Sequence, residues 1–421
     1  MEEPDPQRSA EAAVAAWARS GAMALTGPAD GPGLGPPAPL VPRLGAVAEH
    51  LAHRTAQLGR LVDVDPLALL AERAAVAGLR RRGQVSCGGA TRLLRAADGW
   101  LAVSLARPED VELLPAWLAQ PVDGDDVWPV VAATVRERPA DELASRARLL
   151  GLPVGALPAE PPSPPTAPAP LVPLPCRATL VADAAPVASL EDLVVVDLGA
   201  LWAAPLAGAL LADAGATVIK VESTSRPDGA RRGPAALFDR LNAGKRSVAL
   251  DLRAGDGRRA LTDLLARADV VLEAARPRAL EQLGIRAEDL LRGGRPRVWA
   301  SITAHGRTGE AANAVGFGDD AAVAGGLVAW DGDAPCFCAD AVADPVTGLV
   351  AAAAALDALA TGGRWLLDLA LSATAAHLAG PTLPVPAGTV AADPTPPPDR
   401  GRAPALGAHT TDVLAELGVR S

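Results

Sequence analysis

Short apolar runs alternate with helical stretches through the middle of this chain of 421 residues, and that alternation limits the fold more than any other feature. The runs are rich in valine, leucine and isoleucine, which favours strands. They lie at 193–198, 217–222, 247–252, 269–274 and 297–303, with helical periodicity at 205–215 and 257–268. Strand, helix and strand in succession predict an α/β fold with a parallel sheet, which binds ligands beyond the carboxyl ends of its strands. The turn after the first strand lacks G-x-G-x-x-G spacing, so no nicotinamide or flavin dinucleotide is indicated.

Two proline-rich stretches, at 156–175 and about 381–404, divide the chain. Proline blocks helix formation and lacks an amide donor, so both stretches are expected to be extended. Before them, helices are expected at 10–20, 43–58, 65–82, 109–119 and 140–150, and a strand at 99–105. The expected units are an N-terminal part at 1–155, a linker at 156–187, an α/β domain at 188–380 and a tail with a C-terminal helix at 381–421.

Net charge and cysteine usage argue against several classes of binding partner and against a metal site. The formal net charge of −10 argues against binding to nucleic acid or to an acidic membrane surface, so an anionic ligand needs a local basic patch. The chain begins with an acidic stretch that lacks a signal core, and none of its apolar runs resembles a membrane span. Free thiols in the cytoplasm and no metal site are expected, because neither disulfide nor zinc-ligand spacing relates Cys87, Cys176, Cys336 and Cys338.

Asp344, in "ADPVTG", allows two interpretations. Aspartate is favoured directly before a helix and proline as its first residue, so a capping role is the default. Gly348 fits a plain helix badly, because glycine costs about 1 kcal/mol relative to alanine, and it is easier to explain where something approaches the backbone. Asp319 precedes another alanine-rich helix, and His305 follows a strand as a loop residue would. No Ser/His/Asp arrangement indicates a hydrolase.

A cluster of cationic residues occupies 225–252, and the only two lysines of the chain, Lys220 and Lys245, fall in or beside it. A solvated charged face is the default interpretation of such a cluster. The alternative is a phosphate site, because Lys245 and Arg246 follow the flexible turn "NAG" and directly precede a strand.

The motifs from residue 190 to the C-terminus resemble the class III CoA-transferase family, the CaiB/BaiF or formyl-CoA transferase-like enzymes. The most specific motif is "LNAGKRSVALDL" followed by "ADVVLE", and "RVWASITAHGRTG" and "ADPVTGLVAAAAALDAL" add to it. The N-terminal part resembles a different portion of the same family, through "RSGAMALTGPADGPG" and "DGWLAVSLARPEDVELLPAWL". The resemblance implies a Rossmann-like parallel sheet with flanking helices and a smaller, mainly helical α+β domain. It also implies a fused, permuted chain of one partial and one nearly complete copy.

In that family an aspartate attacks the acyl-CoA thioester, and the released thiolate forms an aspartyl-CoA thioester that passes CoA to a second acid. The resemblance places this nucleophile at Asp344, with Asp319 and His305 as secondary candidates. Acyl-CoA and a carboxylic acid are then the substrates, no cofactor is bound permanently, and a homodimer or a heteromer with a related chain is expected. The residues implied in CoA binding are Trp202, Ala203, Arg231, Leu241, Asn242, Gly244, Lys245, Arg246, Ala274 and Arg276.

Two alternatives within the family remain open. A 2-methylacyl-CoA racemase needs a His–Asp pair, but Gly318 replaces its aspartate and no histidine falls near 286–292. The other alternative is a catalytically degenerate CoA-binding paralogue or partner subunit. Aligning Gly45 with Gly348 places Val41 opposite Asp344, so on this alignment the first copy has no nucleophile.

Overall fold

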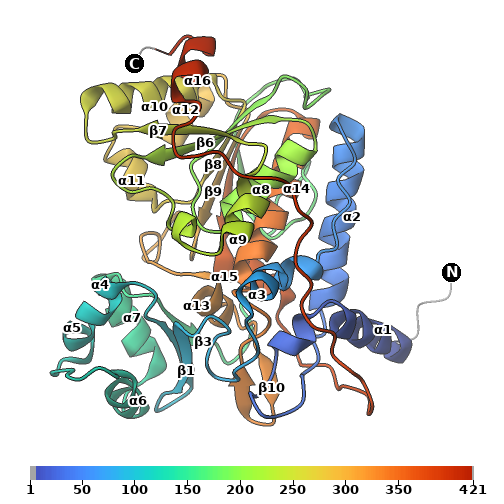
Figure 1. The fold of residues 1–421 in the computed structure, drawn as a ribbon, viewed down its shortest axis with the longest axis vertical. Helices are drawn as coiled ribbons and strands as arrows, with labels where there is room; N and C mark the ends of the chain where they lie inside the picture. The colour runs from blue at the N-terminus through green and yellow to red at the C-terminus, as the bar shows by residue number, and fades with distance from the viewer. Residues whose placement is uncertain (1–5, 420–421) are drawn as a thin grey trace.

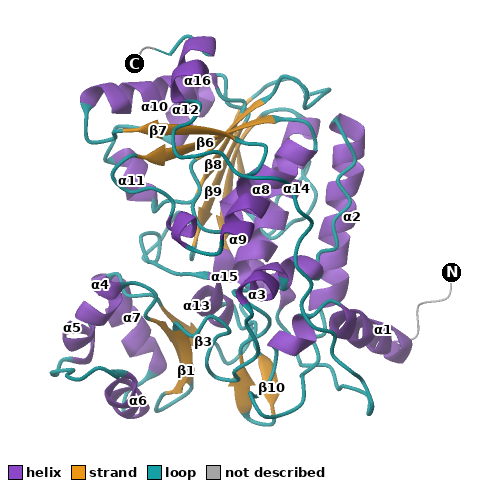
Figure 2. Ribbon diagram, in the orientation of Figure 1, coloured by secondary structure: helices purple, strands orange, loops and turns teal. Residues whose placement is uncertain are grey.

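A seven-stranded sheet forms the centre of the computed structural model, which describes residues 6–419 (Figure 1 and Figure 2). All neighbouring strands are parallel except β4, which lies at one edge and pairs antiparallel with β12. The order is β4-β12-β9-β8-β5-β6-β7, with bounds Arg177–Ala182, Arg364–Ala370, Val298–Thr303, Val270–Glu273, Val194–Asp197, Thr217–Ser223 and Arg246–Leu250. Every strand expected between 193 and 303 is present, so the prediction of a parallel α/β sheet is confirmed.

Helices cover both faces of this sheet. On one face α14 (Ala343–Thr361) packs against α8 (Ala203–Asp213) and α2 (Leu40–Leu58), and all three share one apolar core with the strands. The short α15 (Leu371–Leu378) follows β12 and packs on α14. The other face carries α10 (Gly255–Arg267), α11 (Pro277–Glu281), α12 (Ala287–Gly293) and α16 (Thr410–Glu416).

Helix α14 consists mostly of alanine and other small apolar residues, and nearly all of them are buried. Gly348 is required by this close packing, because a Cβ there would lie 2.6 Å from the Ala203 carbonyl oxygen of α8. By length and composition α14 could also cross a membrane, which corrects the expectation that no run resembles a span. However, 89% of its apolar window is buried inside the protein, as in the core helix of a globular fold.

The N-terminal part contributes a second, smaller sheet of order β1-β2-β3, at the lower left of Figure 1. Its three antiparallel strands are Thr91–Arg95, Trp100–Ser104 and Val154–Leu157. These strands pack with four helices around a separate apolar core. Pro115 divides the single helix expected at 109–119 into two. The sheet contacts α13 (Gly318–Ala324) of the central part through β2 and β3. The four helices are α4 (Pro108–Glu112), α5 (Leu114–Leu118), α6 (Trp128–Arg136) and α7 (Ala140–Leu150).

Residues 6–78 contribute most of their buried apolar side chains to the main core, and Leu25, Ala71 and Ala74 form a small separate cluster with Cys87. Leu44, Leu51 and Leu70 are fully buried in the same core as α14. The helix expected at 65–82 is shortened, because Gly78 adopts a left-handed conformation with φ of 65° and ends it. The elements of this region are α1 (Pro6–Arg19), the 3-10 turns Ala22–Leu25 and Ala68–Leu70, α2 and α3 (Glu72–Ala77).

The proline-rich segments are extended as expected, yet they pack against the rest of the molecule. Within the linker, Leu171 and Leu174 are buried in the main core, and the edge strand β4 lies in a segment where no strand was predicted. The tail runs along one side of the molecule from α1 back to α16, and its Ala392 amide donates to the Ala18 carbonyl oxygen (Figure 1). The remaining elements are the 3-10 turn Gly229–Arg232, α9 (Ala235–Asn242), and the hairpin of β10 (Ala329–Asp331) and β11 (Ala334–Cys336).

Candidate active site

Asp344 is the second residue of α14, and its amide donates to the Ala341 carbonyl oxygen at 2.9 Å. Val342 precedes the helix and no side chain caps it, so the capping interpretation of Asp344 is wrong. The carboxylate lies beside Gly318, the first residue of α13, where a Cβ would be 2.6 Å from Asp344 Oδ2. Part of the Asp344 side chain stays accessible, in the first turn of a helix whose dipole favours negative charge.

Charged side chains gather around this helix start. Arg73, from α3, donates from Nε to Asp340 Oδ2 at 2.7 Å and from Nη2 to Asp340 Oδ1. Asp340 is fully buried, whereas Asp319 stays partly accessible and accepts the Ala341 amide at 3.1 Å. The carboxylates of Asp319, Asp340 and Asp344 therefore all interact with one guanidinium, that of Arg73.

The electrostatics of the cluster suit a nucleophilic carboxylate. Removal from water raises the pKa of Asp344 to about 7, with Arg73 opposing the rise and Asp319 adding to it. Desolvation likewise raises the pKa of Asp319 to about 6, and Asp340 adds repulsion. A poorly solvated carboxylate is more basic than a surface carboxylate and is better able to attack an acyl carbon. The arrangement can support a covalent acyl or thioester intermediate on Asp344.

Trp202 lies in the loop that leads from the carboxyl end of β5 to α8, and it is the residue directly before that helix. The guanidinium carbon of Arg73 lies 5.4 Å from the centroid of the Trp202 ring, within the range of a cation–π contact. Arg73 thus joins the N-terminal part to two groups of the central part, Trp202 and Asp340. No sequence signal marked Arg73, which lies in an ordinary amphipathic stretch, and Asp340 carried no motif of its own.

Lys245 cannot reach a phosphate in this structure. Its fully buried ammonium donates to Asp197 Oδ2 at 2.8 Å, the Pro205 carbonyl oxygen at 2.7 Å and Asn242 Oδ1 at 3.2 Å. All three hydrogens are used, so the expectation that Lys245 binds phosphate is corrected.

Arg231 and Arg246 are also engaged within the protein. Arg231 donates to both carboxylate oxygens of Glu222, at 2.8 and 2.6 Å, and Arg246 pairs with Glu416 at 3.0 Å. These pairs correct the expectation of free phosphate-binding cations at both positions. Of the other residues implied in CoA binding, Ala203, Leu241 and Asn242 are buried, whereas Gly244 and Ala274 are exposed.

A different group of arginines lies where the parallel sheet would bind an anion. Arg276 follows β8 and Arg226 follows β6, so both lie beyond the carboxyl ends of strands. Burial lowers the pKa of Arg276, and the nearby charges of Arg278, Arg107 and Arg226 lower it further. Among the described residues, no carboxylate forms an ion pair with Arg226, Arg276 or Arg278. Uncompensated cations that repel one another form a site for a polyanion.

His305, at the end of β9, lies in a separate cavity of about 200 Å³ under the proline-rich linker. Its Nδ1 is 3.2 Å from Ser372 Oγ, and burial, with Arg148 adding to it, lowers its pKa to about 4. The lining of this cavity includes none of Arg73, Asp319, Asp340 and Asp344. No group of three or more histidines, cysteines, aspartates or glutamates suited to a metal ion occurs between residues 6 and 419.

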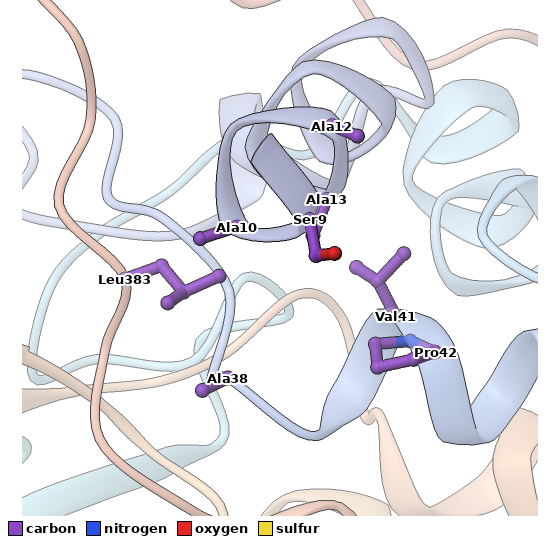
Figure 3. Close-up of a pocket in the computed structure, with 8 residues that line it drawn as sticks. All are labelled: Ser9, Ala10, Ala12, Ala13, Ala38, Val41, Pro42 and Leu383. Atoms are coloured by element: carbon purple, nitrogen blue, oxygen red, sulfur yellow. The ribbon is translucent and has the colours of Figure 1, made fainter. Parts of the chain in front are cut away.

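A larger pocket, of about 440 Å³, opens between α1 and the start of α2 (Figure 3). Val41 and Pro42 line it, which are the residues aligned with Asp344 and Pro345. Apart from Ser9, its lining is apolar, so this pocket offers no carboxylate nucleophile. Its lining residues are Ser9, Ala10, Ala12, Ala13, Ala38, Val41, Pro42 and Leu383.

Comparisons with known proteins point to one family. A family model described as CoA-transferase family III matches residues 190–411. A succinyl-CoA–D-citramalate CoA-transferase of Chloroflexus aurantiacus is 33% identical over 150 residues, which cover 34% of this chain and 37% of that protein. A succinate–glutarate CoA-transferase of Agrobacterium fabrum is 32% identical over 202 residues, covering 43% and 50%. The match thus spans half or less of these curated relatives.

The crystal structure of the hypothetical protein Rv3272 from Mycobacterium tuberculosis is 32% identical in sequence, with a TM-score of 0.42, and the match covers 47% of this chain and 57% of that one. Because the family model covers more than half of the chain, the chain belongs to CoA-transferase family III.

Proposed function

We propose that the chain moves CoA between an acyl-CoA thioester and a carboxylic acid, with Asp344 as the nucleophile. The observation that carries the proposal is the Asp344 carboxylate itself. It is partly accessible, lies in the first turn of α14 and is held near neutral pKa by desolvation. A group with those properties in a CoA-transferase family member is suited to covalent catalysis.

The proposed reaction proceeds through two anhydrides. An Asp344 oxygen attacks the acyl carbon, and the C–S bond breaks to release CoA thiolate. The thiolate attacks the Asp344 carbonyl carbon, which forms aspartyl-CoA and releases the first acid. The second acid then attacks aspartyl-CoA, and the thiolate, released again, takes the new acyl group and leaves Asp344 as a carboxylate.

The phosphates of CoA are proposed to bind at the free arginines beyond β6 and β8. Arg276 was implied by the family resemblance, and Arg226 and Arg278 act on it electrostatically from nearby. Three cations without acidic partners suit the diphosphate of a CoA better than the buried Lys245 does.

We also propose that two partial copies of the family fold are joined in this chain. Helices α2 and α14 both have 19 residues, and each carries proline as its third and glycine as its sixth residue. Arg54 and Asp357, at equivalent positions of the two helices, form a hydrogen-bonded ion pair with an Nε–Oδ1 distance of 2.9 Å. Contact between equivalent positions is expected when two copies pack about a local two-fold axis.

The experiment is to incubate the purified chain with succinyl-CoA and an acid panel containing glutarate, D-citramalate and mesaconate, the acids that relatives' names specify. Exchange of CoA should occur, hydroxylamine should convert Asp344 to a hydroxamate, and Asp344→Asn should abolish both. Exchange that survives in Asp344→Asn would refute the assignment.

A partner-subunit role is the second candidate. It is favoured by the internal pairing of Lys245, Arg231 and Arg246, and one relative is the beta subunit of a succinyl-CoA–L-malate CoA-transferase. It predicts no exchange by the chain alone or as a homodimer, and exchange when a related chain is added.

A further inference from the structure

A carboxylic acid that approaches Asp344 meets strong repulsion. Its carboxylate must come within bonding distance of the carboxyl carbon of Asp344 in aspartyl-CoA, while Asp319 and Asp340 lie close by. At short range in a site with little water, like charges repel by several kcal/mol at an effective dielectric constant of about 20. An acid substrate therefore needs a cation beside Asp344.

Arg73 has one hydrogen-bond donor, Nη1, that no residue of the described chain uses, and it acts electrostatically on Asp344. Its Nε and Nη2 are held by Asp340, and Nη1 makes no hydrogen bond in the part of the chain that the structure describes. The Arg73 side chain is 29% exposed, and Nη1 is not among the fully buried polar atoms that lack a partner in the described residues, so a ligand can reach it. The bidentate pair and the Trp202 ring fix the guanidinium plane, which lets the free edge bind a carboxylate with little loss of entropy.

The lysines cannot serve this purpose. Lys245 is fully buried on Asp197, and Lys220 is buried on Asp228 at 2.9 Å. Arg73 is the cation that opposes the raised pKa of Asp344.

We propose that Arg73 binds the carboxylate of the acid substrate through its free Nη1 edge and holds it beside Asp344. This inference rests on the proposed function and adds the recognition of the acid. The N-terminal part then supplies a specificity residue to the site of the central part.

The test measures binding of glutarate and succinate to the free protein by calorimetry, and the KM for the acid where exchange is detected. Arg73→Gln alone would leave Asp340 buried and unpaired, so Arg73→Gln/Asp340→Asn, which removes both charges, is the main variant. Arg73→Lys keeps the positive charge but removes the planar set of guanidinium donors. Arg295→Gln is the control, because Arg295 also makes a bidentate pair, with Asp269, but before the amino ends of β8 and β9.

The double variant should weaken acid binding about 10- to 100-fold, the range for loss of a charge-assisted hydrogen bond, with Arg73→Lys intermediate and Arg295→Gln unchanged. Unchanged acid binding in the folded double variant, or no saturable acid binding by the wild-type protein, would overturn the inference. Arg73-dependent acid binding without CoA exchange would support the inference and reject the proposed function.

Discussion

At the scale of single residues, Asp344 sets the pH dependence of the proposed reaction. Its pKa is raised to about 7 by desolvation, so the nucleophilic, ionised form increases as the pH rises through that value. We expect the rate of aspartyl-CoA formation to rise tenfold per pH unit below about pH 6 and to level off above about pH 8. Rapid-quench measurements across this range test it, and a rate that is flat with pH would contradict the assigned pKa.

Asp320 offers a stability test beside the site. It is fully buried, Ser104 Oγ and the Phe317 amide donate to its Oδ1, and its Oδ2 has no partner among the described residues. Desolvation raises its pKa to about 7 from an ordinary value of 3.8. Between these two pH values the folded protein holds a proton on Asp320 that the unfolded chain has released. The free energy of unfolding therefore decreases as the pH rises from 3.8 to about 7.

Asp320→Asn cannot ionise, and we expect it to stabilise the protein more at about pH 8 than at about pH 5, by roughly 1 kcal/mol. Thermal unfolding of both proteins at the two pH values measures the difference. Equal effects at both values would show that Asp320 is ionised and well solvated.

The family motifs indicated Asp344 and, as a secondary candidate, Asp319, but neither Arg73 nor Asp340. Asp344 stands in a motif, whereas Arg73 is distant in sequence and lies on α3, which packs against α9. The buried role of Lys245 was equally invisible, because a lysine before a strand looks the same whether it binds a ligand or Asp197.

At the scale of elements, Gly348 of α14 and Gly45 of α2, which the proposed alignment pairs, should respond in opposite ways. Gly348→Ala would push a Cβ to 2.6 Å from the Ala203 carbonyl oxygen, whereas a Cβ at Gly45 would have no atom within 4 Å. We expect Gly348→Ala to destabilise by about 1–3 kcal/mol and Gly45→Ala to stabilise by about 0.5–1 kcal/mol. Chemical denaturation of the two variants measures both changes, and changes of the same sign would contradict the helix packing described here.

Strands and long helices were predictable because their periodicity is local. The edge strand β4 was not, because its residues, Arg177–Ala182, are half exposed and take their conformation from pairing with β12. The proline-rich linker looked independent in sequence, yet its Leu171 and Leu174 are buried in the main core.

At the scale of the whole molecule, the N-terminal and central parts depend on each other. Leu44 and Leu51 of α2 are fully buried against α14 and its neighbours. We expect residues 188–421 alone to be insoluble or to lack a cooperative unfolding transition, and co-expression with 1–187, which keeps the linker leucines and β4, to restore it. A truncated chain that unfolds cooperatively at the temperature of the full protein would contradict this shared core.

The most direct test of the central claim follows the oxygen atoms of Asp344. In the proposed reaction each turnover leaves one oxygen of the second acid on the Asp344 carboxylate. After incubation with acyl-CoA and an acid labelled with oxygen-18, mass spectrometry of the peptide that contains Asp344 should show the label on that residue, and no label should appear in the absence of acyl-CoA. CoA exchange with the label absent from Asp344 would contradict the account.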